Sequence, residues 1–150
     1  MGLTKPRSFL KNHQRIAIDT SIFIYHLEAK PAYFDMTDEI FAWLERSPRT
    51  AVTSSLTMTE LLVQPYRTRN LALVNQYYGL LSTFPNLEWV APDLAIADAA
   101  ARIRADHNLR TPDALQVATS IRSGATALLT NDMDLSRVSQ IEVAILDQLR

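Results

Sequence analysis

The sequence predicts a single α/β domain in which a mainly parallel central sheet of four to five strands is flanked by helices. The chain has 150 residues, the length of one ordinary domain. Short apolar runs, which indicate buried strands, alternate along it with amphipathic segments of helical length. This alternation is typical of a parallel sheet with helices on both faces.

Five apolar runs are expected to form the strands. They are short, rich in Ile, Val, Leu and Ala, and bounded by polar or turn-forming residues. In chain order they span 15–19, 50–53, 87–91, 127–130 and 142–146. The first ends in Asp19, and the fourth is followed by Asn131 and Asp132.

The expected helices begin where a capping residue precedes an apolar stripe. They span about 20–28, 37–47, 55–65, 70–84, 93–107 and 111–123. Pro65 is expected to end or kink the third, since proline disrupts a helix interior. Thr111 is expected to cap the last helix, with Pro112 at its first position and Gly124 closing it.

Residues 1–14 are expected to be a loose leader, followed by one domain over 15–150. No internal repeat, low-complexity tract or linker indicates a second domain. The absence of cysteine excludes a disulfide framework and a zinc–thiolate site. No run approaches the roughly 20 apolar residues of a membrane span, so a cytoplasmic protein without membrane contact is expected.

The net charge of −1 provides no global basic field for nucleic acid. A polyanion would therefore need local arginines or a bound metal. Arg67, Arg69 and Arg110 are the candidates for contacts to the phosphates of such a polyanion, because they flank the helices that bear Glu60 and Asp113. Solvated surface charge is the alternative for each of them.

Four acids are candidates for an active site: Asp19, Glu60, Asp113 and Asp132. Ligands of parallel sheets bind beyond the carboxyl ends of the strands, where Asp19 and Asp132 are expected. Asp113 falls in the first turn of a helix, where the dipole favours an anion. The ordinary alternatives are capping and turn roles, but the two acids that follow buried strands share matching flanks.

Glu60 is expected on an inward-turning helical face, which it shares with Leu56 and Val63. An acid on such a face would line a site, although a solvated helix edge is an equal alternative. Four acids in one compact site would repel strongly, by about 4 kcal/mol for a pair 4 Å apart at an effective dielectric near 20. Hard Mg²⁺ or Mn²⁺ suits such oxygen ligands and would support phosphodiester hydrolysis by activated water.

Four short motifs resemble those of the PIN-domain family, and more narrowly of VapC-type toxins from toxin–antitoxin pairs. They occur in family order at 18–25 (IDTSIFIY), 59–61 (TEL), 111–119 (TPDALQVAT) and 129–134 (LTNDMD). The resemblance covers roughly residues 16–146 and implies a PIN-like fold. It also implies an endoribonuclease that depends on Mg²⁺ or Mn²⁺.

Under this resemblance Asp19, Glu60, Asp113 and Asp132 match the catalytic, metal-binding quartet of the family. Asp134 matches an additional metal-site acid of many members. Ser21 and Thr130 fall where hydroxyls hydrogen-bond the metal-binding carboxylates, and Asn131 is expected to shape the turn.

The resemblance further implies a homodimer, an RNA substrate and a cognate antitoxin protein that reaches the active site. Phe34, Trp43, Tyr77 and Tyr78 are candidate partner-groove residues, with core packing as the alternative, above all for Trp43.

Two other functions are alternatives to the nuclease. One is an RNA-binding or RNA-processing module that rarely cuts, against which the complete quartet argues. The other is a haloacid-dehalogenase-like phosphatase, which needs a second Asp two residues after the first; Ser21 stands there instead.

Overall fold

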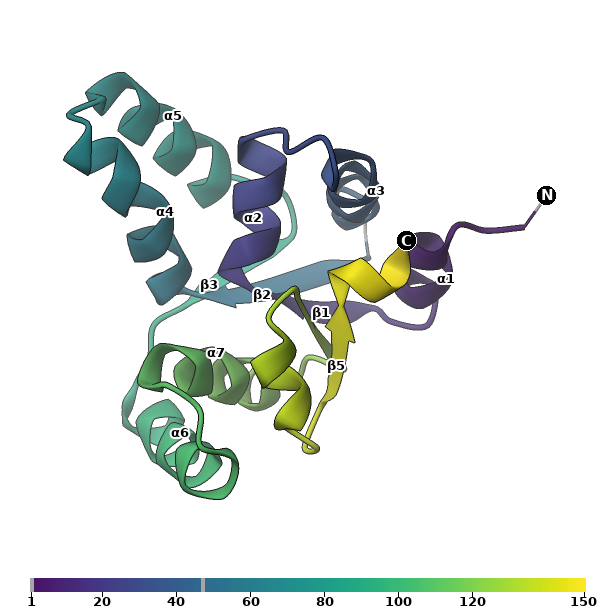
Figure 1. Ribbon diagram of the computed structural model, residues 1–150, viewed down its shortest axis with the longest axis vertical. Helices are drawn as coiled ribbons and strands as arrows, with labels where there is room; N and C mark the ends of the chain where they lie inside the picture. The colour runs from purple at the N-terminus through teal and green to yellow at the C-terminus, as the bar shows by residue number, and fades with distance from the viewer. Residues whose placement is uncertain (1, 47) are drawn as a thin grey trace.

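The computed structural model describes residues 2–46 and 48–150. It contains one five-stranded sheet in the order β3-β2-β1-β4-β5, and every neighbouring pair of strands is parallel (Figure 1). The strands are β1 (Arg15–Ile18), β2 (Thr50–Ser54), β3 (Leu87–Val90), β4 (Ala127–Thr130) and β5 (Glu142–Ile145). The predicted fold class is therefore confirmed.

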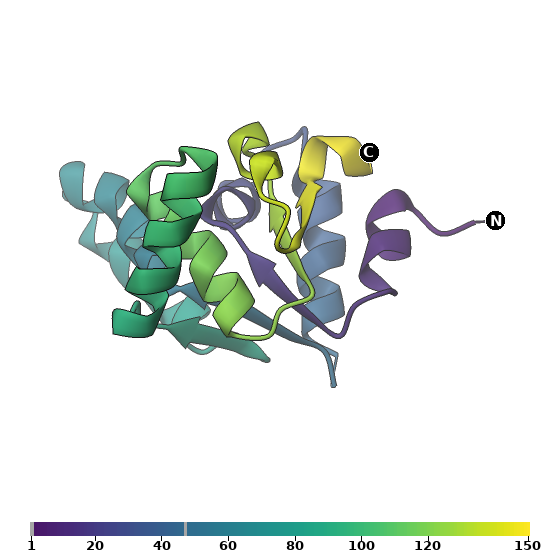
Figure 2. The ribbon, with the colours of Figure 1, turned by 90° about the horizontal axis from the view of Figure 1, so that it is seen from below.

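Helices cover both faces of this sheet. One face carries α2 (Thr20–Leu27), α3 (Phe34–Leu44), α4 (Ser55–Arg67) and α5 (Leu71–Ser82). The other carries α6 (Leu94–His107) and α7 (Thr111–Arg122), the two green helices that lie side by side in Figure 2. Two 3₁₀ helices, η1 (Met133–Arg137) and η2 (Leu146–Leu149), follow β4 and β5. None of the described helices is long and apolar enough to cross a membrane.

Alternate residues of the central strands supply two separate cores. Ile16 and Ile18 of β1 pack under α2 and α3, whereas Ala17 faces α6 and α7. In β4, Leu129 joins the first core and Leu128 the second. A strand that is buried on both faces must be apolar at every position, which is why these strands are continuous apolar runs in the sequence.

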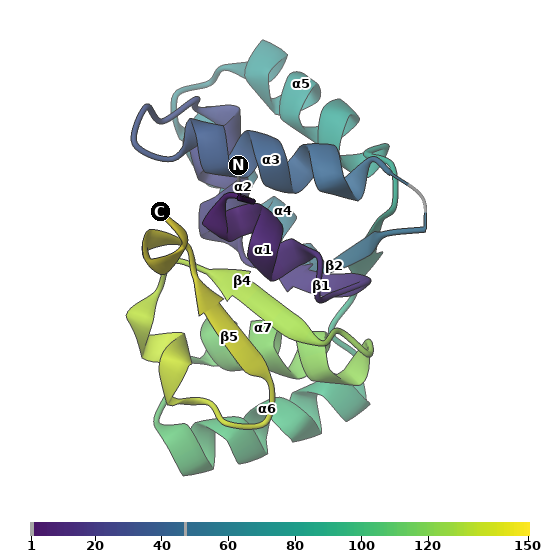
Figure 3. The same ribbon diagram turned by 90° about the vertical axis from the view of Figure 1, so that its right-hand side faces the viewer.

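The expected loose leader is wrong, because residues 5–10 form the helix α1 (Lys5–Leu10). Thr4 caps it by accepting a hydrogen bond from the Arg7 backbone N–H, and Pro6 lies in its first turn. Leu10 is 1% exposed and belongs to the first core. Figure 3 shows α1 lying alongside α3. A threonine cap followed by proline was a helix signal in the sequence. The expected domain boundary at residue 15 stays a prediction.

Several helix ends differ from the sequence prediction. Helix α3 begins at Phe34 rather than Thr37, whose buried hydroxyl donates to the Phe34 carbonyl oxygen. Pro65 does not end α4, which continues to Arg67.

In α7, Arg110 is the N-cap and Thr111 is the first helical residue. The predicted cap at Thr111 is therefore wrong by one residue. The Thr111 hydroxyl instead accepts a hydrogen bond from Arg104. Gly124 follows the end of α7 with φ +76°, a conformation that glycine adopts without strain, so the expected stop is confirmed.

Candidate active site

The predicted acids surround the carboxyl end of the sheet at the point where its strand order reverses. From β1 the chain adds β2 and β3 on one side, then returns through α6 and α7 to place β4 on the other side. Asp19 follows β1 directly, and its backbone N–H donates to the Leu129 carbonyl oxygen of β4 at 2.9 Å. Asp132 follows β4 as the N-cap of η1. Such a reversal leaves a crevice between the neighbouring strands, which is where parallel sheets bind ligands.

The carboxylate of Asp19 is held on both oxygens by side chains from two other elements. Thr130 Oγ1 donates to Oδ2 at 2.7 Å, and Gln116 Nε2 approaches Oδ1 at 3.4 Å. Burial raises the pKa of Asp19, and the charge of Asp113 raises it further, whereas these hydrogen bonds lower it in part. The protein therefore holds a carboxyl group where its ionised form is disfavoured, a common property of functional sites.

Glu60 reaches the same region from α4. Its Oε1 accepts a hydrogen bond from Thr20 Oγ1 at 2.9 Å, directly after Asp19 in the chain. Partial burial raises the pKa of Glu60, and the charges of Asp19 and Asp113 raise it further. Asp113 is thus close enough to oppose the ionisation of Asp19 and of Glu60, and Asp19 is close enough to oppose that of Glu60.

The helical face of Glu60 differs from the prediction. The buried residues of α4 are Thr57, Leu61 and Pro65, spaced four apart, while Val63 is 37% exposed. The face shared with Leu56 and Val63 therefore does not turn inward, and that prediction is wrong. Glu60 lies beside the buried stripe, at the rim of the crevice.

Asp132 is joined to the other acids indirectly. Its backbone N–H donates to Thr130 Oγ1 at 3.1 Å, so one hydroxyl contacts both Asp132 and Asp19. Its own Oδ1 accepts from the Asp134 backbone N–H at 2.9 Å. Asp134 points elsewhere in this structure: its carboxylate pairs with Arg137 at 3.1 Å and is 61% exposed. Across residues 2–46 and 48–150, no three His, Asp or Glu side chains are arranged to hold a metal ion.

Of the two predicted hydroxyls, Thr130 contacts a carboxylate of the quartet. Ser21 Oγ instead accepts a hydrogen bond from the Asn131 backbone N–H at 3.3 Å, so it supports the loop after β4. The Asn131 amide donates to the hydroxyls of Tyr25 and Tyr33 and accepts from the Asp147 backbone. These contacts agree with the predicted role of Asn131 in shaping this turn.

Sequence reasoning missed a buried polar network beneath the acids. Gln116 is 4% exposed, and its Oε1 accepts from the Ser54 backbone N–H at 3.1 Å. Its Nε2 donates to Thr57 Oγ1 at 2.9 Å as well as facing Asp19. A signal was present in the sequence, because Gln116 lies three residues after Asp113 and therefore on the same face of α7.

Among the three candidate arginines, Arg110 is at the site. Its Nε donates to Asp113 Oδ2 at 3.1 Å, and its side chain is 79% exposed. Its pKa is raised first by Asp113 and also by the charges of Asp132 and Glu60. Arg67 and Arg69 lie at and beyond the end of α4; Arg67 is two turns after Glu60, roughly 10 Å along the helix axis.

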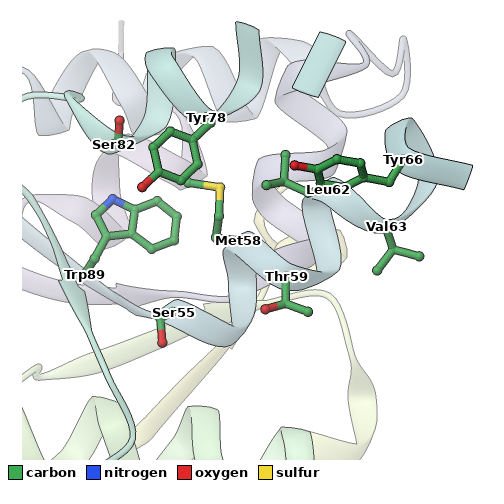
Figure 4. A pocket seen from close by; sticks show the side chains of 9 residues that line it. All are labelled: Ser55, Met58, Thr59, Leu62, Val63, Tyr66, Tyr78, Ser82 and Trp89. Carbon is green, nitrogen blue, oxygen red and sulfur yellow. The ribbon is translucent and has the colours of Figure 1, made fainter. Parts of the chain in front are cut away.

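The four candidate partner-groove residues lie in different places. Tyr78 lines an apolar groove of about 800 Å³ between α4, α5 and β3, with Met58, Leu62 and Trp89 (Figure 4). Tyr77 lines a separate cavity of about 130 Å³ that also includes Glu60. Phe34 and Trp43 line neither of these two cavities. Phe34 stacks on the His26 ring, and Trp43 packs against the first core, which is the core-packing alternative expected for it.

The comparisons with known proteins agree with this architecture. No curated protein matches the sequence. A toxin–antitoxin complex from Klebsiella pneumoniae is similar in structure, with TM-score 0.68, 20% identity and 87% of this chain and 97% of that chain covered. VapBC-1 from nontypeable Haemophilus influenzae is similar with TM-score 0.69 and 17% identity, and the match covers 89% of this chain and 98% of that chain. VapC20 from Mycobacterium tuberculosis is described as a toxin that cleaves the sarcin–ricin loop. It is similar with TM-score 0.63 and 18% identity, and the match covers 85% of this chain and 98% of that chain.

At these low identities the TM-scores show a shared fold. The sequence model of the PIN domain matches residues 16–141, which is most of the chain and includes all four predicted acids. The chain therefore belongs to the PIN domain family.

Proposed function

We propose that this protein is a metal-dependent endoribonuclease of the VapC type, the toxin of a toxin–antitoxin pair that acts in the cytoplasm. The observation that carries the proposal is the convergence of Asp19, Glu60 and Asp113 from three different elements. The charge of Asp113 raises the pKa of both Asp19 and Glu60, and the charge of Asp19 raises the pKa of Glu60. Folding places these charges together at a cost, which a bound cation would relieve.

The donor set fits Mg²⁺ or Mn²⁺. All the candidate ligands are carboxylates, the oxygen ligands that these hard cations prefer. Asp19, Glu60 and Asp113 would hold the ion. Asp132, the fourth acid of the quartet, and Asp134, the additional acid, would supply further ligands from the segment after β4. When bound, the cation supplies Lewis acidity and lowers the pKa of a bound water.

The protein's own groups have separate roles in this proposal. Thr130 and Gln116 fix the orientation of the Asp19 carboxylate, and Thr20 fixes that of Glu60. Arg110 has most of its side chain exposed beside the acids, where it could contact a substrate phosphate. Arg67, two turns from Glu60, is proposed to contact RNA farther along the strand, together with Arg69.

The structural neighbours support the RNA substrate and the protein partner. One of them is described as cleaving the sarcin–ricin loop, and others are toxins in complex with antitoxins. We infer an antitoxin-type partner that covers the apolar groove at Tyr78, since that groove presents several large apolar side chains to solvent. A homodimer also stays a proposal, and light scattering during size-exclusion chromatography would test it.

A single-turnover cleavage assay tests the nuclease proposal. Total bacterial RNA and a sarcin–ricin stem-loop transcript would be incubated with excess protein in Mn²⁺, with and without EDTA. We expect cutting by the wild type, none in EDTA and none by Asp19→Asn. Asp98→Asn is a matched control, because Asp98 is an exposed acid on α6 that pairs with Arg102. Metal-independent cutting by pure Asp19→Asn would contradict the proposal.

An RNA-binding or RNA-processing module is the second candidate. The observation that favours it is the lack of a ready metal-binding group among the described residues. It predicts that the wild type retains RNA on a filter in Mn²⁺ but leaves the RNA uncut in single turnover.

A further inference from the structure

A second groove, of about 340 Å³, lies between α1 and α3. Leu10 and Lys11 precede the first residue of β1, and Arg46 and Arg49 precede the first residue of β2. The groove therefore lies at the amino end of the sheet, opposite the carboxyl end that carries the acids. Figure 3 shows the two helices that border it side by side.

The rim of this groove is strongly basic. Arg7, Lys11, Arg46 and Arg49 line it together with one acid, Glu39. Glu39 is already engaged, since it accepts from Thr4 Oγ1 at 2.8 Å and lies 3.8 Å from Arg7 Nε. Within the described ranges, Lys11, Arg46 and Arg49 take part in no ion pair. Four cations against one engaged carboxylate give a local positive potential on a chain whose net charge is −1.

The floor of the groove is apolar. Leu10, Ala42 and Trp43 line it, and Leu3 lies at its edge with 56% exposure. The indole Nε1 of Trp43 is buried, and no acceptor for it is found in the described part of the chain. A basic rim over an apolar floor is complementary to a ligand that combines carboxylates with apolar side chains.

We propose that the groove between α1 and α3 binds an acidic peptide segment of a protein partner, with apolar side chains on the floor and carboxylates at the basic rim. RNA fits less well, because its phosphates would satisfy the rim but leave the aliphatic floor without a partner. The helix α1 precedes the region matched by the family model, whereas α3, on the other side of the groove, lies inside that region. The proposal does not depend on nuclease activity.

The test uses the full chain and a fluorescent twelve-residue peptide of Glu and Leu, with Leu at helical spacing. Fluorescence anisotropy should show saturable binding that weakens as salt rises. Lys11→Glu with Arg46→Glu should weaken it at least about tenfold, because each reversal turns attraction into repulsion at the rim. The matched control, Arg102→Glu with Arg122→Glu, changes the net charge equally on exposed positions of α6 and α7 and should bind as the wild type does.

An NMR measurement adds a readout that needs no charge reversal. The peptide should shift the indole N–H signal of Trp43, which Trp43→Phe identifies, and leave that of Trp89 in place. A peptide with Lys in place of Glu should shift neither. The proposal is overturned by equal binding to both charge-reversed variants, or by an unmoved Trp43 signal at saturating peptide. It is also overturned if a uridine oligonucleotide, rather than the peptide, moves that signal.

Discussion

At the scale of single residues, the hydroxyl of Thr130 connects two acids of the site. It donates to Asp19 and accepts from the Asp132 backbone N–H. Thr130→Val removes both contacts, so we expect a loss of about 1–3 kcal/mol in the free energy of unfolding from the unpaired groups. We also expect cleavage to slow by roughly 10–100-fold, the usual effect of losing a group that orients a metal ligand.

Urea unfolding and single-turnover cleavage measure these two effects. Thr130→Ser should recover most of the activity, since it restores the hydroxyl. Thr119→Val is the matched control, because that buried hydroxyl only donates to the Leu115 carbonyl oxygen within α7. If Thr130→Val and Thr119→Val cut RNA equally well, Thr130 does not position the site.

The raised pKa of Asp19 also predicts a pH dependence of stability. Burial raises the pKa of Asp19 above its ordinary value, so the folded state favours the protonated acid. The free energy of unfolding should therefore fall as pH rises from about 4 through the raised pKa. Asp19→Asn carries no such charge, so in EDTA it should equal the wild type near pH 4. At pH 7 it should be more stable by about 1 kcal/mol, a common gain when a functional acid is neutralised.

Thermal unfolding of both proteins across this pH range measures the difference. Asp98→Asn should show no such trend, since Asp98 is exposed. A constant offset between Asp19→Asn and the wild type from pH 4 to 7 would mean that burial does not disfavour the Asp19 carboxylate.

At the scale of elements, α1 is an integral part of the first core. Leu10 is 1% exposed among residues of α3 and η2, so Leu10→Ala should lower the free energy of unfolding by about 2–5 kcal/mol. Leu3→Ala, at a 56% exposed position, should change it by less than about 0.5 kcal/mol. Urea unfolding of the two variants measures this difference. If both changed the free energy of unfolding equally little, residues 1–14 would be a loose leader and α1 would not belong to the core.

The elements could be predicted where local signals decide them. The central strands were predictable because both of their faces are covered, which makes them apolar throughout. The start of α4 was predictable from Ser54, whose side chain accepts from the Leu56 backbone N–H. The first turn of α3 could not be predicted, because Thr37 resembles an N-cap in the sequence. Only the structure shows that Thr37 is buried inside the helix, which begins at Phe34.

At the scale of the whole molecule, the site is assembled by long-range contacts. Asp19 bonds to Thr130, 111 residues away, and to Gln116, 97 residues away. Asp19, Asp113 and Asp132 could be predicted because each has a local signal, a strand end or a helix start, whereas Glu60 could be predicted only from its resemblance to a family motif. The network of Gln116 and Thr57 could not, since it depends on how α7 and α4 approach each other across the end of the sheet.

The central claim is that these acids together hold a divalent cation, and calorimetric titration with Mn²⁺ tests it most directly. We predict saturable binding to the wild type, loss of that binding in Asp19→Asn and in Asp113→Asn, and wild-type binding in Asp98→Asn. Unchanged Mn²⁺ binding in both site variants, or no binding to the wild type, would contradict the claim.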